Sequence, residues 1–178
     1  RIAHQAEDLQ AQIARWIGTD EPQSALLLSP PGYGKTTLLR EWVRYFSDRG
    51  FTAAIADERS EIAALADGVP QLAVGRCTDV MEGCSKWQAA VMLLKTMSPA
   101  LLALDEITAP EDAKAVSLCT HCGTAVIACA HAAGLDDLRQ RPIYRELLAL
   151  GAFHQAVIIE KQDGQRVYRM ERWEETKC

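Results

Sequence analysis

Apolar residues recur along the chain with a helical period in some segments and as short continuous runs in others. Apolar positions about 3.6 residues apart predict a first amphipathic helix that ends near Gly18. Continuous runs predict buried strands at 25–28, 51–56, 101–104 and 124–130. Helical spacing predicts helices between these strands, at 35–48, 85–98 and 110–122. Strands that alternate with helices indicate an α/β fold with a mainly parallel sheet.

The remaining segments have weaker patterns. Between 60 and 80, several glycines and Pro70 predict loops, with one strand at 71–74. After residue 134, helical spacing predicts two short helices that are separated at Pro142.

The end of the chain has the pattern of a β-hairpin. Segments 153–161 and 166–172 alternate between apolar and polar residues on either side of Asp163-Gly164, a dipeptide typical of a tight turn. We therefore expect two antiparallel strands here. The acidic stretch after Glu171 is expected to be a loose end.

A glycine-rich stretch lies between the first predicted strand and the helix that follows it, which is the layout of a phosphate-binding P-loop. Gly32 and Gly34 permit a tight turn, and the helix N-terminus adds partial positive charge. Lys35 is expected to reach the β- and γ-phosphates of ATP, and the Thr36 hydroxyl is expected to bind Mg²⁺. The predicted nucleotide-binding residues are Pro31, Gly32, Tyr33, Gly34, Lys35, Thr36 and Thr37.

One position departs from the motif, because Ser29 stands where the P-loop has its first glycine. An ordinary strand–turn–helix connection would also explain the pattern and would need neither Lys35 nor Thr36. Independent support comes from Asp105 and Glu106, which follow the apolar run 101–104 as in a Walker B motif. Asp105 is expected to hold Mg²⁺ through its water shell, and Glu106 to activate water as a general base. The alternative for these acids is a cap on the next helix.

Two further groups of polar residues follow predicted strands. Residues just past the carboxyl ends of parallel strands face the ligand crevice, so Asp57-Glu58-Arg59 and His131 are candidates for the same site. Glu58 is an alternative general base, and His131 is placed to sense the γ-phosphate. The alternatives are a solvated turn at 57–59 and a histidine that only bonds the backbone.

Composition limits the classes of function. The chain has 178 residues, of which 48% are hydrophobic, enough for one α/β domain with a core. The net charge of −5 argues against a nucleic-acid surface, and the six scattered cysteines fit reduced cytosolic thiols. Cys119-Thr120-His121-Cys122 is a single C-x-x-C pair, which favours a helix end over a zinc site. The chain begins at Arg1 inside a helical pattern, so we expect a fragment that lacks N-terminal residues.

Several stretches, in this order, resemble the stage III sporulation protein AA family, ATPases of endospore-forming bacteria that are related to the type II and type IV secretion ATPases. The resemblance covers roughly residues 25–160. The matching stretches are 30–40, 57–63, 78–80, 83–86, 97–99, 105–107, 130–131 and 135–142. Residues 57–59 correspond to the acidic box of these ATPases and His131 to their histidine box. Ala132 and Ala133 depart from the glycine and small polar residue that relatives usually carry.

The resemblance implies a P-loop NTPase of the RecA-like (ASCE) class, with a mainly parallel central sheet flanked by helices and a C-terminal β-hairpin. We expect one ATPase domain over 1–178, with a helical lead-in at 1–18, a core at 25–160, and a hairpin and tail at 153–178. The resemblance also implies an additional N-terminal domain, a homo-hexameric ring, and the cofactors ATP and Mg²⁺. The expected partners are membrane-embedded components of a sporulation channel. The expected location is the mother-cell cytoplasm, peripherally on that complex.

Ring ATPases complete their sites with a basic residue from the neighbouring subunit. Arg59 and Arg76 are the preferred candidates for this role, ahead of Arg139 and Arg141, although each could be a solvated surface charge. Two other functions remain open for the chain as a whole. One is a nucleotide-dependent assembly module with little turnover, which the pair Asp105-Glu106 disfavours. The other is a RecA-like ATPase that acts on DNA, which the acidic charge disfavours.

Overall fold

The computed structural model describes residues 2–173, with side chains from Leu9 onward. The predicted loose end after Glu171 therefore falls mostly outside the described residues. The first predicted helix is confirmed as α1 (Ile2–Ile17), which buries Leu9, Ile13 and Ile17. Among residues 2–173, no helix has both the length and the apolar character that crossing a bilayer requires.

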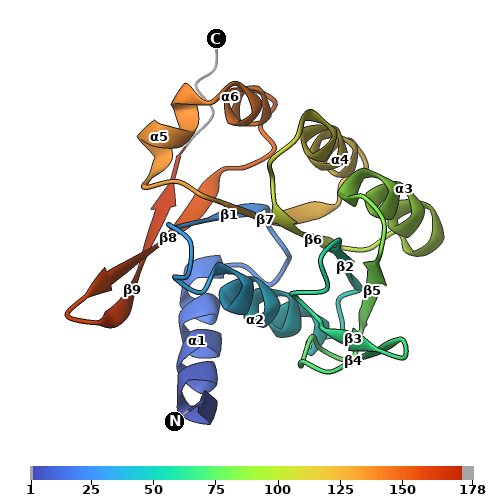
Figure 1. The fold of residues 1–178 in the computed structure, drawn as a ribbon, viewed down its shortest axis with the longest axis horizontal. Coiled ribbons are helices and arrows are strands. Elements are labelled where there is room, and N and C mark those ends of the chain that lie inside the picture. Colours follow the sequence, from blue (N-terminus) through green and yellow to red (C-terminus); the bar gives the residue numbers. More distant parts are fainter. Residues whose placement is uncertain (1, 174–178) are drawn as a thin grey trace.

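A central sheet organises the molecule (Figure 1). Within the described residues it has seven strands in the order β5-β2-β6-β7-β1-β8-β9. Each neighbouring pair is parallel except β8 and β9, which form the predicted antiparallel hairpin. The strands are β1 (Ala25–Leu28), β2 (Ala53–Asp57), β5 (Thr78–Glu82), β6 (Leu101–Glu106), β7 (Ala125–Ala130), β8 (Gln155–Gln162) and β9 (Gln165–Arg172).

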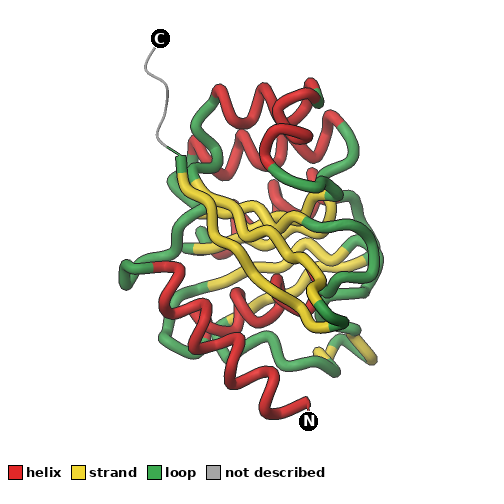
Figure 2. The backbone as a smooth tube through the Cα atoms, turned by 90° about the vertical axis from the view of Figure 1, so that its left-hand side faces the viewer, coloured by secondary structure: helices red, strands yellow, loops and turns green. Residues whose placement is uncertain are grey.

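Helices cover both faces of the sheet, which Figure 2 shows nearly edge-on between them. One face carries α1 and α2 (Lys35–Ser47). The other carries α3 (Lys86–Met97), α4 (Pro110–His121), α5 (Leu135–Gln140) and α6 (Pro142–Ala149). Alternate residues of β1 enter the two cores, Leu26 and Leu28 on the α3–α6 side and Leu27 on the α1–α2 side. Burial on both faces explains why the parallel strands read as continuous apolar runs.

The structure corrects the prediction of a strand at 71–74. A small hairpin of β3 (Leu65–Ala66) and β4 (Val69–Pro70) lies nearby, and the additional sheet strand is β5, paired with β2. Asp67 and Gly68 have φ values of 51° and 77°, which form the hairpin turn. β5 is an edge strand whose residues are half-buried or exposed, so its sequence lacks the apolar run that marks the interior strands.

The C-x-x-C pair lies at a helix end, as the preferred interpretation holds. α4 ends at His121, and Gly123 follows with φ 74°. Cys119 is buried and Cys122 is exposed. Burial raises the pKa of the Cys119 thiol to about 12.

Candidate nucleotide-binding site

The P-loop connects the carboxyl end of β1 to the N-terminus of α2. Gly34 precedes the helix with φ 94°, in the left-handed region that a side chain would strain. Lys35 is the first residue of α2, and Thr36 and Thr37 lie in its first turn. The first N–H groups of a helix have no partner within it, so this end of α2 is suited to bind an anion.

Ser29 is fully buried inside the turn. Its hydroxyl donates to the Pro30 carbonyl O at 2.8 Å, and its own carbonyl O accepts a hydrogen bond from Lys35 Nζ at 3.0 Å. Lys35 Nζ also donates to the Pro30 carbonyl O at 3.3 Å. Lys35 Nζ also donates to the Ser29 hydroxyl O at 3.4 Å, a contact with the P-loop lysine that a glycine at this position could not make. Burial lowers the pKa of the Lys35 ammonium, while nearby Glu106 opposes that shift.

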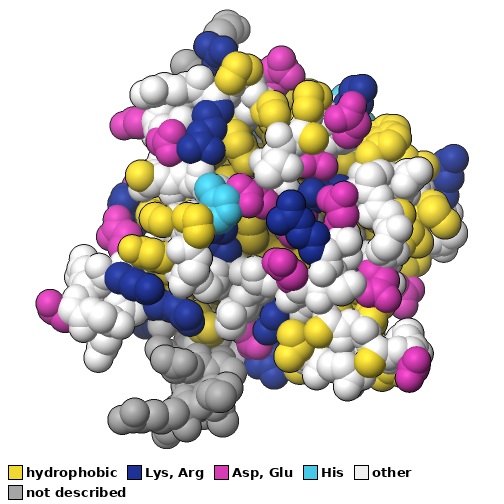
Figure 3. Space-filling model, viewed as in Figure 1, with side chains coloured by type: hydrophobic (Ala, Val, Ile, Leu, Met, Phe, Trp, Pro, Cys, Tyr) yellow, Lys and Arg dark blue, Asp and Glu magenta, His cyan; other side chains and the backbone are white. Residues whose placement is uncertain are grey.

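Three ionisable side chains form a continuous row beside the P-loop. Lys35 Nζ lies 2.8 Å from His131 Nδ1, and His131 Nε2 lies 2.7 Å from Glu106 Oε2. An ammonium group only donates and a carboxylate only accepts, so a neutral imidazole with its proton on Nε2 satisfies both contacts. The His131 and Glu106 side chains are 36% and 30% exposed, so the row remains open to solvent. Figure 3 shows a histidine with acidic and basic side chains around it near the centre of this face.

The strand order brings this row together. β7 lies between β1 and β6, and all three are parallel, so their carboxyl ends meet at one edge of the sheet. Lys35 follows β1, His131 follows β7, and Glu106 ends β6. The pairing of β6 with β7 shifts register between Leu104 and Glu106, which marks a β-bulge or a similar irregularity at the acidic pair. Bulges of this kind redirect side chains at strand ends, including those at active sites.

Asp105 meets a lysine that the site prediction did not include. Lys86 Nζ lies 2.8 Å from Glu58 Oε2, 3.1 Å from Asp105 Oδ1 and 3.5 Å from Asp112 Oδ2, and its side chain is 6% exposed. Burial alone would lower the pKa of Lys86, but the hydrogen bond to Glu58 and the negative charges of Asp105 and Asp112 outweigh it and raise the pKa. Burial raises the pKa of Asp105, and Lys86 opposes that shift. The single positive charge of the ammonium thus offsets part of the negative charge of three carboxylates.

Lys86 reaches this position because α3 begins at it. The Ser85 hydroxyl accepts from Gln88 N, and the Gln88 side chain accepts from Ser85 N, so the two residues form a capping box. A lysine in the first turn opposes the helix macrodipole. That mismatch is a signal in the sequence, because a cation placed there needs nearby acids to offset it.

The three residues 57–59 have different roles. Asp57 is buried and accepts hydrogen bonds from the backbone N–H groups of Glu61, Ile62 and Ala63, so it holds the following loop and does not face the crevice. The expectation of three crevice-facing side chains is therefore wrong for Asp57. Glu58 joins the Lys86 cluster, and Arg59 is exposed.

Comparison with known proteins places this chain in a family. The family model described as "Sporulation stage III, protein AA" matches residues 1–170. The chain belongs to this stage III sporulation protein AA family. The stage III sporulation protein AA of Bacillus subtilis (strain 168) is 33% identical over 169 residues, which cover 92% of this chain and 55% of that protein. The chain thus spans little more than half the length of this relative.

Two solved structures share the fold of this stage III sporulation protein AA family member. The Legionella pneumophila ATPase DotB superposes with a TM-score of 0.65 at 16% identity, over 93% of this chain and 49% of that one. The VirB11 ATPase from the Brucella suis type IV secretion system, solved in complex with sulphate, gives a TM-score of 0.62 at 15% identity, over 96% and 52%. At these identities the similarity concerns the fold alone, and it confirms the predicted P-loop NTPase class.

The arginines considered for a neighbouring site lie in different places in this family member. Arg76 donates to the Asp48 carbonyl O at 3.1 Å. Asp48 lies at the C-terminus of α2, the end of this helix that is far from the P-loop. Arg139 and Arg141 pair with Asp136 and Asp137 on the exposed surface of α5. Arg59 follows the carboxyl end of β2, on the same side of the sheet as the P-loop. In the described residues, none of the four forms a hydrogen bond or an ion pair with Lys35, His131 or Glu106.

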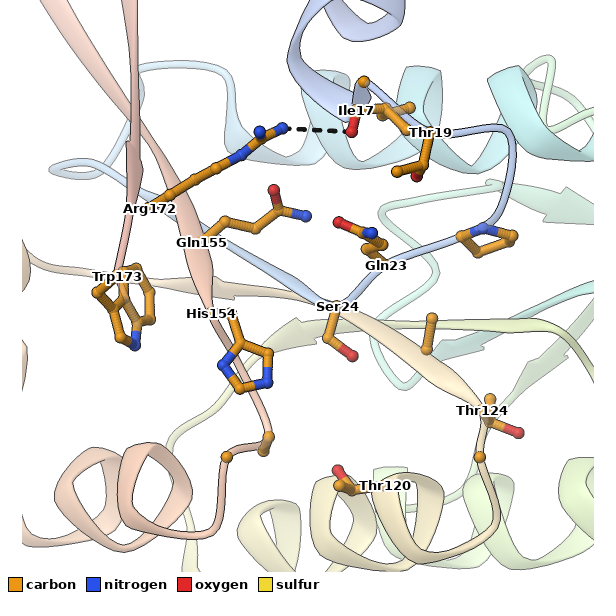
Figure 4. Close-up of a pocket in the computed structure, with 16 residues that line it drawn as sticks. Ile17, Thr19, Gln23, Ser24, Thr120, Thr124, His154, Gln155, Arg172 and Trp173 are labelled. Atoms are coloured by element: carbon orange, nitrogen blue, oxygen red, sulfur yellow. Dashed lines mark hydrogen bonds between the residues drawn. The ribbon is translucent and has the colours of Figure 1, made fainter. Parts of the chain in front are cut away.

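A cavity of about 840 Å³ lies away from the P-loop, at the amino ends of β1, β7 and β8 (Figure 4). Gln155 is 3% exposed and points toward this cavity, and neither atom of its amide has a hydrogen-bond partner in the described residues. Arg172 donates to the carbonyl O of Ile17 across the cavity wall. The P-loop residues do not line the cavity, so its size does not identify the candidate site of this sporulation-family chain.

Proposed function

We propose that this chain is the catalytic domain of a Mg²⁺-dependent ATPase. The observation that carries the proposal is the row of Lys35, His131 and Glu106, which links a P-loop lysine to a carboxylate at the end of a buried strand. A phosphate-binding lysine and a candidate general base are thereby held in one hydrogen-bonded unit. An interaction module that only binds nucleotide would need the lysine but not the base.

The residues present fit ATP and Mg²⁺. Thr36 and Asp105 would hold the ion. Asp105 Oδ1 is buried, and among the described residues it forms an ion pair with Lys86 but accepts no hydrogen bond. Among the described residues, no three His, Cys, Asp or Glu side chains form a group that could hold a metal ion. A Mg²⁺ site usually needs only one or two protein ligands, because phosphate oxygens and water complete its coordination. When bound, Mg²⁺ neutralises charge on the phosphates.

The chain's own side chains divide the remaining work. Lys35 places its ammonium on the β- and γ-phosphates of the substrate, and the first N–H groups of α2 bind phosphate oxygens. Glu106 accepts a proton from the attacking water. The Nε2–H of His131 orients the Glu106 carboxylate, and its Nδ1 faces Lys35. His131 therefore couples the phosphate-binding group to the base, which suits a sensor of the γ-phosphate.

In the full-length protein, we propose that this domain works as a secretion-ATPase-like motor. Membership of the sporulation family and the folds of the DotB and VirB11 ATPases support this. The motor would be a homo-hexamer in the mother-cell cytoplasm, peripherally docked on membrane-embedded channel components between mother cell and forespore. Its hydrolysis of ATP would energise that channel, without a role for nucleic acid.

Phosphate release from ATP tests the enzymatic proposal. We expect Mg²⁺-dependent release by the wild type and none above background for Lys35→Ala, because the variant lacks the charge that binds the phosphates. Lys95→Ala is the matched control, since Lys95 is an exposed lysine on α3 away from the P-loop. Binding of ATP without turnover would favour the assembly module. Turnover that requires added DNA, at a stated salt concentration, would favour the DNA-acting ATPase.

A further inference from the structure

The C-terminal hairpin projects past the end of the P-loop strand. β8 runs parallel to β1, with Ile158 opposite Leu28, the last residue of β1. β8 then continues to Gln162 before the chain turns into β9. At about 3.3 Å per residue, this overhang is longer than 10 Å. The P-loop begins directly after Leu28, so this part of the hairpin extends past the start of the P-loop, and its turn projects outward at the lower left of Figure 1.

Two basic residues of the hairpin lie against the P-loop. The Arg166 guanidinium is so close to Gly34 that a Cβ on Gly34 would lie 2.8 Å from Arg166 Cζ and 3.1 Å from its Nε and Nη1. Lys161 Nζ lies 4.5 Å from the centroid of the Tyr33 ring. Both cations therefore touch residues of the predicted nucleotide-binding stretch, and Figure 3 shows basic side chains on this hairpin surface.

The register places these two cations side by side. Lys161 pairs with Arg166 across the antiparallel strands, and directly opposite residues project from the same face of a sheet. Like charges in such a pair are destabilising unless an anion lies between or near them. Both side chains are exposed, and neither forms an ion pair with a carboxylate in the part of the chain that the structure describes. The next basic residue of β9, Arg169, instead pairs with Glu160 and Glu171.

We propose that Lys161 and Arg166 bind the phosphates of a nucleotide held in the P-loop of the same chain. The inference rests on the proposed function and deepens it, because it adds a pair of phosphate-binding residues in cis. The P-loop already gathers positive charge from Lys35 and from the α2 N-terminus. Two more cations at the same place, in a chain of net charge −5, are favourable once a polyphosphate supplies the compensating charge.

Of the two residues, Arg166 is the principal one. Its planar guanidinium presents several N–H donors that match phosphate oxygens, whereas the Lys161 ammonium is a point charge already placed over Tyr33. Two properties of Gly34 permit this arrangement. Its backbone has a positive φ, and the absence of a side chain leaves room for the guanidinium. The proposed role is in binding and positioning the phosphates, separate from that of an arginine from a neighbouring subunit.

Binding of fluorescent ATP and ADP to the full chain tests this proposal. We expect Arg166→Ala to weaken both affinities by roughly tenfold, the effect of losing one charge-assisted contact, and Lys161→Ala by a smaller factor. Arg166→Lys should recover part of the affinity because it retains the charge. Arg169→Ala, on the same strand but ion-paired away from the P-loop, should bind within twofold of the wild type.

The outcomes separate this proposal from the proposed function. If the wild type binds ATP, Lys35→Ala does not, and Arg166→Ala binds within twofold of the wild type, the hairpin proposal is overturned and the P-loop site stands. If Lys35→Ala binds ATP like the wild type, the P-loop site itself is wrong. The melting temperature of Arg166→Ala without nucleotide should equal that of the wild type or lie slightly above it, because the variant loses the repulsion between Arg166 and Lys161. Loss of affinity together with a lower melting temperature, and without recovery in Arg166→Lys, would also overturn the proposal.

Discussion

Replacing Lys86 with methionine removes the charge at the centre of the acidic cluster while keeping the apolar length of the side chain. The ammonium contacts Glu58, Asp105 and Asp112 at 2.8, 3.1 and 3.5 Å. Glu58 is 41% exposed and regains hydration when the lysine is lost. Asp112 keeps hydrogen bonds from the Thr108 and Ala109 N–H groups. The loss therefore falls mainly on Asp105, 18% exposed, whose Oδ1 is buried.

Breaking a buried ion pair by removing one partner costs about 3–5 kcal/mol, and the exposure of Glu58 favours the lower end. We expect Lys86→Met to lose about 3 kcal/mol, which corresponds to a fall in melting temperature of roughly 6–12 °C for a chain of this size. Lys95→Met, an exposed position on the same helix, is the control and should melt with the wild type. Equal melting of wild type and Lys86→Met, measured by calorimetry at pH 7, would refute this reasoning.

The same pair of proteins gives a test by pH. The pKa of Lys86 is raised in the fold above the ordinary lysine value of 10.5. A raised lysine pKa contributes stability that is fully present below the ordinary value and is lost as the pH rises through the folded value. The difference in unfolding free energy between wild type and Lys86→Met should therefore be constant from pH 7 to 10 and shrink above 10.5. A difference that shrinks as the pH falls from 10 to 7 would have the wrong sign for this lysine.

Two further predictions concern the chemistry. Glu106→Gln should keep ATP affinity near that of the wild type and slow hydrolysis by a factor on the order of 10²–10⁴, as measured by phosphate release. If Glu106→Gln stays active and Glu58→Gln is slowed instead, Glu58 is the base. An arginine acting from the neighbouring subunit predicts turnover per chain that rises with protein concentration, and partial rescue when Arg59→Ala or Arg76→Ala is mixed with Lys35→Ala. Turnover that is independent of concentration, with no rescue, would mean that one chain completes its own site.

The sequence predicted those parts of the fold and site that depend on local pattern. The apolar runs identified β1, β2, β6 and β7 because both faces of these strands are buried. Residues at the ends of such strands then had to meet at one edge of the sheet, so Lys35, Glu106 and His131 could be assigned to one crevice. The edge strand β5 was missed because an exposed strand needs no apolar run.

Contacts between distant segments could not be predicted in the same way. Lys86 meets Glu58 and Asp105 only because α3 begins beside the ends of β2 and β6, which depends on the strand order. Arg166 reaches Gly34 because β8 pairs with β1 and extends past it, and no spacing in the sequence specifies that neighbour. The alternating pattern predicted the hairpin itself but gave no indication of the loop beside which it lies.

The most direct test of the central claim is an experimental structure of the chain with Mg²⁺ and a non-hydrolysable ATP analogue. In the structure described above, Lys35 Nζ contacts the carbonyl oxygens of Ser29 and Pro30 and the ring of His131. We predict that it contacts the β- and γ-phosphates of the analogue, with Thr36 and Asp105 at the metal and Glu106 facing the γ-phosphate. An analogue bound elsewhere, such as in the cavity beside Gln155, with Lys35 still on the loop carbonyls, would contradict the proposed ATPase site.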